Sequence, residues 1–264
     1  MKSEPNNKVG FLSVANFESV RGFVDNHAKP VYFDDTLSLY NAVKGEDVIA
    51  GLTSGVVHEE EGPFNVFPSK VISPRAFQMK KGDDSWDLLR AADAAVVRTQ
   101  VDGEVKKALA DNCPFQATYV QNCYTGDREK VPFPSASNAT GLLKDVIETR
   151  VLKILAHGTL DNKPNWYEDG NYQVDPSTGF WPDCVGYFLG QLQKEYGRDI
   201  TLERIWMKGE EGSKMIVNGN VHMTEPYYIY EGLSFENVPR KWSFEFSSIV
   251  MGYQQQYLTL KHED

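Results

Sequence analysis

The side chains that most often carry catalysis occur in this sequence without the spacing that catalysis or metal binding requires. Five histidines are present, and no two of them stand at a metal-ligand spacing (His27, His58, His157, His222 and His262). The chain contains no phosphate-binding glycine loop, no HExxH pattern and no GxSxG nucleophile motif. We therefore expect no catalytic residue, no metal site and no cofactor.

The cysteines leave two interpretations open. Cys113, Cys123 and Cys184 form no CxxC motif, so neither a zinc site nor a redox pair is indicated. One interpretation is isolated thiols. The other is a Cys113–Cys123 bridge, which would close a short loop and imply an oxidising compartment.

Composition and charge limit the class of protein. The 264 residues are 41% hydrophobic and 24% charged, with a mean hydropathy of -0.44, which is typical of one or two globular domains. With 37 acidic and 27 basic residues the net charge is -10, and we expect no nucleic-acid partner because phosphate binding needs a basic surface. The apolar runs are far shorter than the roughly 20 residues of a membrane span, so we expect no membrane insertion. Residues 1–8 lack the apolar core of a secretory signal, and we expect any export signal to lie outside this chain.

Strands and helices alternate at the start of the chain. Short apolar runs at residues 9–14, 31–33 and 47–52 predict buried strands. Between them, the spacing predicts helices at residues 17–24 and 37–44, the second capped by Asp34 or Asp35 and ended by Gly45. Such a βαβαβ unit forms a parallel sheet covered by helices.

A second βαβαβ unit follows later in the chain. Strands are predicted at residues 152–156, 200–206 and 220–223, with helices at 181–196 and 213–217. Between the two units, a long helical pattern begins after residues 83–85, with a break at Gly103. Two prolines and several small polar residues mark 131–141 as a linker. Two α/β lobes are the predicted fold class.

Four segments resemble family 3 extracellular solute-binding proteins, which have the two-lobed type II periplasmic-binding-protein fold. Residues 143–154 resemble the amphipathic helix that leads into the first strand of that family. Residues 164–167 resemble its Pro-aromatic ligand loop, and residues 179–183 the start of its first long helix. Residues 239–247 are the most specific match. This segment ends in an acidic residue, a phenylalanine and a serine (residues 245–247), and Arg240 stands seven residues before the serine.

The segments occur in a circularly permuted order relative to that family. The resemblance assigns residues 8–73 to the second lobe and 74–130 to the segment returning to the first lobe. It assigns 131–141 to the linker and 142–264 to the first lobe. A permutation is tolerated where the natural ends lie close together, and a tandem array cut out of register would give the same order.

The resemblance implies a set of ligand-binding residues. In the family the arginine matching Arg240 holds the carboxylate of the ligand, with two parallel hydrogen bonds from a planar guanidinium. Trp166 and Tyr167 match the aromatic loop that stacks on the ligand, Trp206 could form the opposite aromatic wall, and His157 matches a polar contact. About six additional residues between Val221 and Arg240 distinguish this chain from the family.

The second lobe departs from the family pattern. Ser54 occupies the place of the aspartate that binds the ammonium group of an amino acid. Thr53 and Ser54 offer hydroxyl groups instead, and Asn16 matches a strand-to-helix turn whose backbone N–H groups could bind an anion. Burial of an ammonium group against hydroxyls alone is costly, so a carboxylated ligand without a free amine is favoured.

The predicted function is an extracytoplasmic, extracellular or periplasmic, binding module that closes by a hinge on a small carboxylated ligand. Its expected partners are that ligand and a membrane transporter or receptor, with the chain as a monomer or one unit of a tandem repeat. One alternative is a lyase resembling cyclohexadienyl dehydratase on the same scaffold. Another is a ligand-sensing or structural repeat domain of a larger protein.

Overall fold

The computed structural model of the chain describes residues 7–12, 27–53, 62–112, 117–118, 130–156, 179–207, 209–228 and 240–261. The chain divides into two compact units. Unit 1 comprises Met1–Ser73, Tyr230–Gly232 and Tyr253–Asp264, and unit 2 comprises Pro74–Ile229 and Leu233–Gly252. The sequence analysis placed residues 142–264 in one lobe. The structure instead groups Tyr253–Asp264 with unit 1, because the last strand of the chain pairs with a strand of that unit.

Unit 1 contains a parallel sheet of the predicted kind. Strands β1 (Lys8–Phe11), β2 (Lys29–Tyr32) and β3 (Ala50–Thr53) are parallel and have the order β2-β1-β3. Strand β12 (Met251–Leu260) pairs antiparallel with β3, and Gln256 lies opposite Thr53. In this part of a larger sheet, three strands from the start of the chain are thus joined by one from its end.

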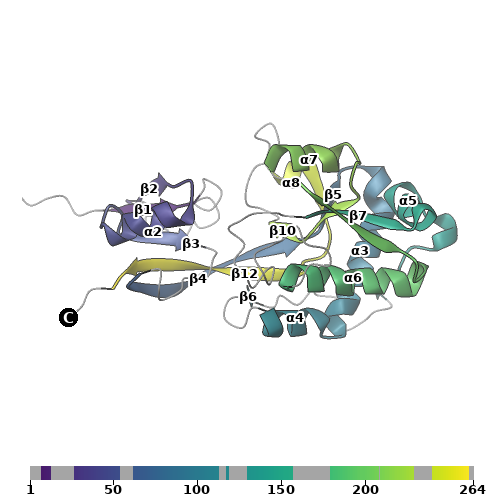
Figure 1. Cartoon of the computed structure of the whole chain (residues 1–264), viewed down its shortest axis with the longest axis horizontal. Coiled ribbons are helices and arrows are strands. Elements are labelled where there is room, and N and C mark those ends of the chain that lie inside the picture. The colour runs from purple at the N-terminus through teal and green to yellow at the C-terminus, as the bar shows by residue number, and fades with distance from the viewer. Residues whose placement is uncertain are drawn as a thin grey trace, which may run out of the picture. The chain divides into compact units, whose positions relative to one another are not determined.

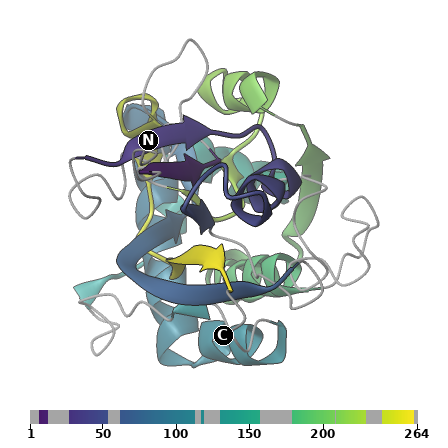
Figure 2. The same cartoon turned by 90° about the vertical axis from the view of Figure 1, so that its left-hand side faces the viewer.

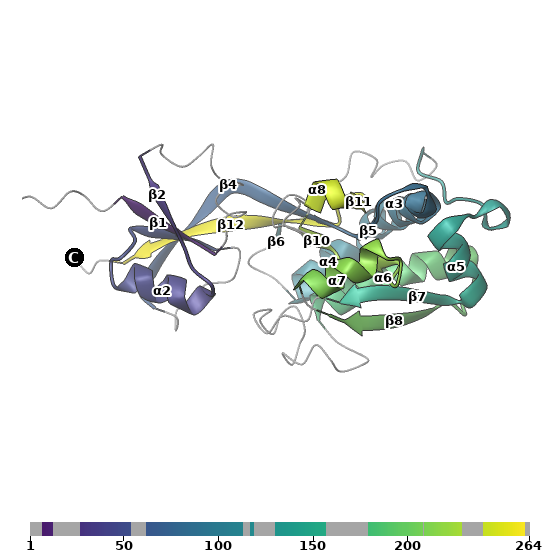
Figure 3. The same cartoon turned by 90° about the horizontal axis from the view of Figure 1, so that it is seen from above.

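Helix α2 (Thr36–Lys44) packs on this sheet, as Figures 2 and 3 show. Asp35 caps it, because the Ser38 N–H donates to the Asp35 carboxylate at 2.7 Å, and Gly45 follows its last turn. Its buried residues form a cluster with Leu258 of β12 (Leu39, Tyr40, Ala42 and Val43). The approach is close because Gly10 carries no side chain, and a Cβ there would overlap Leu39.

Unit 2 contains a second parallel sheet. Strands β7 (Val151–Ala156), β8 (Thr201–Trp206) and β9 (Met223–Thr224) are parallel and have the order β8-β7-β9. Strand β5 (Gln78–Lys80) contacts β9 and pairs antiparallel with β11 (Phe244–Phe246). Both units therefore have three parallel strands in the order second, first, third. In unit 1 the third strand pairs with β12, whereas in unit 2 β5 contacts β9 but belongs to a separate two-stranded sheet with β11.

Helices connect and cover the strands of unit 2 (Figure 1). Helix α5 (Gly141–Thr149) leads into β7, α6 (Phe180–Tyr196) joins β7 to β8, and α7 (Gly209–Val217) joins β8 to β9. The long helical region is α3 (Trp86–Val101) and α4 (Glu104–Asn112), broken at Asp102–Gly103 as predicted. Helix α3 contacts α5 and α6, and α4 contacts α6. The break allows both helices to pack on α6.

The remaining elements are short, except for one strand that connects the units. They are 3-10 turns η2 (Asp83–Ser85) and η4 (Ala136–Asn138), helix α8 (Arg240–Ser243), and strands β4 (Phe64–Ala76), β6 (Ala117–Thr118) and β10 (Tyr227–Tyr228). Strand β4 begins in unit 1 and ends in unit 2, and β12 makes the reverse crossing. The two strands are neighbours in one sheet.

Some boundaries differ from the sequence analysis. The strand predicted at residues 9–14 ends at Phe11, and the strand predicted at 220–223 is Met223–Thr224. The helix predicted at 17–24 and the Cys113–Cys123 pair lie outside the described residues, whereas Cys184 is buried in α6. Within the described residues, no helix is long and apolar enough to span a membrane.

Candidate functional site

The carboxyl ends of the parallel strands are the first place to look for a ligand site in an open α/β sheet. In unit 2 this carboxyl edge consists of Ala156, Trp206 and Thr224, the last residues of β7, β8 and β9. Trp206 lies directly opposite Ala156. The sheet thus places Trp206 at this edge, where the resemblance expects an aromatic wall.

The two faces of this sheet differ in character. Leu155 and Ile205 belong to an apolar cluster with Ile216 of α7 and Phe244 of β11. Successive side chains of a strand point to opposite faces, so Arg204 and Trp206 lie on the face away from that cluster. This second face thus carries Arg204 and Trp206 of β8.

A buried ion pair lies on that second face. Glu225 directly follows β9, and its N–H donates to the Leu155 carbonyl oxygen at 2.9 Å. The Arg204 Nε lies 3.6 Å from a Glu225 carboxylate oxygen, and the exposed fractions of the two side chains are 9% and 0%. Sequence reasoning missed this pair, although a glutamate immediately after a buried strand is the signal that could have revealed it.

Thr224 connects the third strand to the returning strand. The Gln78 N–H donates to the Thr224 hydroxyl at 3.1 Å, and that hydroxyl donates to the Glu225 carbonyl oxygen at 2.5 Å. Gln78, Thr224 and Glu225 are all buried. This chain of hydrogen bonds fixes the backbone at the point where β9 ends.

The most specific matching segment of the sequence has a structural role in the described residues. The Phe77 N–H donates to the Ser247 hydroxyl at 3.1 Å, and the Ser247 N–H donates to the Phe77 carbonyl oxygen at 3.0 Å. Ser247 thus extends the pairing of β11 with β5. Arg240 is the first residue of α8, which leads directly into β11, and its side chain lies outside the described residues.

Thr53 occupies the corresponding carboxyl end of β3 in unit 1. Its side chain is buried, and the residue pairs with Gln256 of β12. Five other residues of the predicted site lie outside the described residues, so the structure does not place them (Asn16, Ser54, His157, Trp166 and Tyr167). Of the predicted set, the structure describes the side chains of Trp206 and Thr53.

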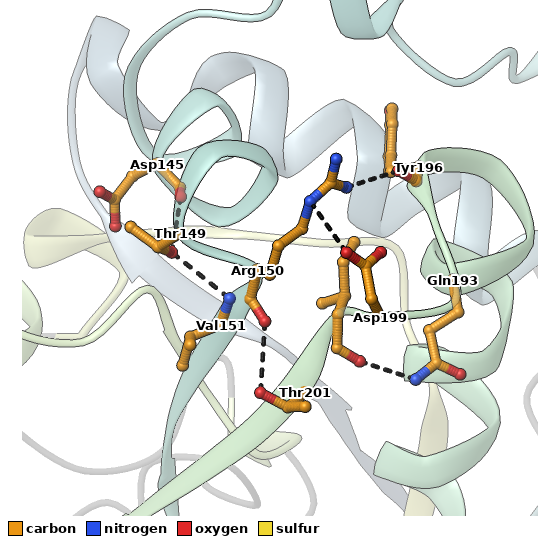
Figure 4. A network of polar contacts seen from close by, with 9 residues as sticks. Asp145, Thr149, Arg150, Val151, Gln193, Tyr196, Asp199 and Thr201 are labelled. Carbon is orange, nitrogen blue, oxygen red and sulfur yellow. Dashed lines mark hydrogen bonds and ion pairs between the residues drawn. The ribbon is translucent and has the colours of Figure 1, made fainter.

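The amino edge of the unit 2 sheet carries a polar network that holds the fold together (Figure 4). Arg150 has a left-handed backbone, donates to the Tyr196 carbonyl oxygen at 2.8 Å and lies 3.4 Å from the Asp199 carboxylate. The Arg150 carbonyl oxygen accepts from Thr201 at the start of β8. These contacts join α5, β8 and the end of α6.

His222 stabilises the same edge. Its Nδ1 accepts the Lys153 N–H at 2.9 Å, which leaves the proton of the neutral ring on Nε2, 2.8 Å from the Asp145 carboxylate. Burial lowers the pKa of His222, although the hydrogen bond and charge of Asp145 oppose this effect. The histidine is therefore a neutral structural group in the fold.

No protein-family model and no curated protein matches this chain. Among solved structures, it is similar to PfVFT1 of Plasmodium falciparum, with 16% identity and a TM-score of 0.48 over 60% of this chain and 54% of the other. It is similar to the effector-binding domain of QuiR in complex with shikimate, with 9% identity and a TM-score of 0.41 over 99% of this chain and 90% of the other. It is also similar to full-length CbnR complexed with target DNA, with 7% identity and a TM-score of 0.40 over 98% and 65%. The chain thus spans less than two thirds of PfVFT1 and of CbnR.

One prediction from composition is corrected by this comparison. The net charge of -10 predicts that the chain has no nucleic-acid partner. Full-length CbnR complexed with target DNA and two proteins described as LysR-family transcriptional regulators, one of them putative, each align with 98% of this chain. The exclusion is wrong, and the net charge of this chain is no ground for ruling out a nucleic-acid partner.

Proposed function

We propose that this chain is a small-molecule-binding module whose ligand is a small polar carboxylate. The observation that carries the proposal is the order second, first, third of the three parallel strands, which is repeated in the two units. Each sheet ends in buried polar side chains at its carboxyl edge, Thr53 in unit 1 and Thr224 with Glu225 in unit 2. Ligands of open α/β sheets bind at such edges.

The finer parts of the proposal concern movement and place. The chain passes between the units twice, near Ser73–Pro74 and near Gly252–Tyr253, and we propose that these crossings are the hinge of a closing movement. The module is proposed to work outside the cytoplasm as a capture or sensing protein and to catalyse no reaction. The resemblance of residues 239–247 supports Arg240 as the group that binds the ligand carboxylate.

Thermal unfolding of the full chain tests the proposal. The panel contains acetate, lactate, malate, succinate, glycine, glutamine and glutamate, because a ligand that binds only the folded state raises the unfolding midpoint. Arg240→Ala is compared with Arg198→Ala, an exposed arginine of unit 2. We expect a carboxylate to stabilise the wild type and Arg198→Ala, and to stabilise Arg240→Ala much less.

Small-angle scattering measures closure on the same samples. A stabilising carboxylate is expected to reduce the radius of gyration of the full chain. No midpoint shift with any carboxylate would contradict the ligand class. A midpoint shift without a change in the radius of gyration would contradict the hinge.

A further inference from the structure

We propose that Asn138 is an N-glycosylation site, with an oligosaccharide attached to its side-chain amide on a surface turn of unit 2. The inference rests on one part of the proposed function, the location outside the cytoplasm. It goes beyond that function because it assigns a covalent modification that ligand binding does not require. It is carried by an acceptor motif, by the exposure of the asparagine and by the place of the turn in unit 2.

The motif is Asn138-Ala139-Thr140. It matches the acceptor pattern of asparagine, any residue except proline, and then serine or threonine. It is the one match to this pattern in the 264 residues. The pattern by itself predicts a loop on the surface of a secreted protein. The structure is an independent test of the motif, because a buried Asn138 within a strand or a long helix would contradict it.

The structure places the acceptor in solvent. Asn138 is exposed and is the last residue of the short turn η4. Its N–H donates to the Ser135 carbonyl oxygen at 3.1 Å, and within the described residues its side chain makes no hydrogen bond. The next residue, Ala139, is buried. A glycan on Asn138 therefore removes no hydrogen bond of the described fold and displaces no buried side chain.

Contacts to the helices of unit 2 fix the turn on both sides. Before the turn, the Tyr196 hydroxyl donates to the Pro134 carbonyl oxygen at 2.9 Å. After it, the N–H and the hydroxyl of Thr140 both donate to the Asp87 carboxylate. The fold thus engages the Thr140 hydroxyl that the acceptor pattern requires. We expect transfer to precede the folding of unit 2, and the folded turn then holds the glycan at a constant place.

That place is the amino edge of the unit 2 sheet. Tyr196, which donates to Pro134, also accepts from Arg150, the residue before β7 (Figure 4). Ligands of open α/β sheets bind at the opposite, carboxyl edge. A bulky glycan on Asn138 therefore leaves the proposed ligand edge uncovered, and we expect its removal to leave the carboxylate-induced midpoint shift unchanged.

The modification is a glycosyl transfer from a lipid-linked oligosaccharide, which is the co-reactant that a secretory pathway supplies. The Asn138 Nδ2 forms a bond to the anomeric carbon of the oligosaccharide. The bond between that carbon and the diphosphate oxygen breaks, and the lipid diphosphate leaves with the electron pair. One amide proton passes to a base of the transferase, and no atom is oxidised or reduced.

Mass spectrometry of the protein from its natural source tests the proposal. Trypsin cleaves after Lys130 and Lys144, so one peptide, residues 131–144, contains Asn138. Peptide N-glycosidase converts a glycosylated asparagine to aspartate. We expect this peptide to appear with aspartate at position 138, carrying oxygen from heavy-oxygen water, once the enzyme has acted. Recovery of the unmodified peptide alone would overturn the proposal.

Translation of the full chain with an added secretory signal and microsomes separates the site from the location. The wild type should gain a gel shift that the glycosidase removes. Asn138→Gln should lose this shift, and Thr140→Ser should keep it because the hydroxyl remains. Asn138→Gln combined with Asn220→Thr creates an acceptor at the exposed Asn218 and should restore the shift, which reports that the chain is translocated.

The outcomes distinguish the two proposals. If microsomes modify the double variant but not the wild type, the inference fails and the proposed function stands. If microsomes modify the wild type but the natural protein is unmodified, the location outside the cytoplasm fails and the inference fails with it. Glycosylation of Asn138 in both supports the inference, whatever the carboxylate panel shows about ligand binding.

Discussion

The backbone N–H of Val250 donates to the carbonyl oxygen of Arg75 at 2.8 Å. This bond lies near the end of β4 and immediately before β12, the two strands by which the chain passes between its units. Gln100 of α3 reinforces the junction, because its side-chain amide donates to the carbonyl oxygens of Ile249 and Val250 at 3.0 and 3.2 Å. Both crossings are thus fixed where they enter unit 2. Any bending of the crossings is expected on the unit 1 side of this junction.

Removal of the Gln100 amide should loosen the junction. We expect Gln100→Leu to destabilise the chain by about 1–3 kcal/mol, because the Ile249 and Val250 carbonyl oxygens lose a buried donor. Urea denaturation of the full chain measures the change. Lys106→Leu on the exposed face of α4 is the control and should change stability by less than about 0.5 kcal/mol. Equal effects of the two substitutions would contradict this role of Gln100.

The sequence was sufficient to predict what local patterns determine. The apolar runs that became β1, β7 and β8 were recognised because a buried strand needs only a few residues of signal. The Asp35 cap and the break at Gly103 followed from capping and glycine chemistry, and both are confirmed. Each of these features depends on neighbours in the chain.

The features that the sequence did not reveal depend on residues far apart in the chain. Strand β12 completes the unit 1 sheet by pairing with β3, about two hundred residues away, and no local pattern encodes that register. The Arg204–Glu225 pair and the His222–Asp145 pair form only when three strands and a helix are in place. Histidine spacing along the chain could therefore not identify the role of His222.

The stability of the chain should depend on pH through His222. Burial is the largest cause that lowers its pKa below the usual 6.5, and the charged groups around it are Asp145 on α5, Lys153 on β7 and Glu203 on β8. The neutral ring accepts the Lys153 N–H, so its contribution is fully present above pH 6.5 and is lost as the pH falls through the lower folded-state value.

Urea midpoints between pH 4.5 and 8 measure this dependence. The wild type should gain stability as the pH rises toward 6.5. His222→Asn keeps an acceptor for the Lys153 N–H but does not titrate, so its profile should be flatter over this interval. A variant with the slope of the wild type would show that other groups determine the pH dependence.

Asp93 should show the opposite sign. Burial is the largest cause that raises its pKa above 3.8, against the lowering effect of the Ser248 N–H that donates to its carboxylate at 2.5 Å. The stabilising contribution of the protonated acid is present below pH 3.8 and is lost as the pH rises through the higher folded-state value. At pH 7 the fold therefore bears the cost of a buried charge.

Substitution by asparagine tests this cost. Asp93→Asn keeps the acceptor for Ser248 without the charge, so its stability relative to the wild type should increase from pH 4 to pH 7. Asp93→Leu removes the acceptor as well, and we expect it to be less stable than Asp93→Asn at pH 7. Urea midpoints at the two pH values measure both effects. An Asp93→Asn variant that is less stable than the wild type at pH 7 would contradict the sign.

Gly141, the first residue of α5, should be intolerant of any side chain for two independent reasons. Its φ is +53°, and a Cβ would overlap the backbone carbonyl of Asp84. Thr140 is held beside it, because its N–H and its hydroxyl both donate to Asp87, at 2.9 and 2.7 Å, so the loop has little freedom to move away. We expect Gly141→Ala to lower the stability of the full chain by more than about 1 kcal/mol.

Gly186→Ala in α6 is the matched control: a Cβ there meets no atom within 4 Å. Alanine favours the helix, so this control should raise the urea midpoint by the equivalent of about 0.5–1 kcal/mol. The two glycine substitutions should therefore change the midpoint in opposite directions, and a gain in stability at both positions would show that the Thr140–Gly141 loop can move away from Asp84.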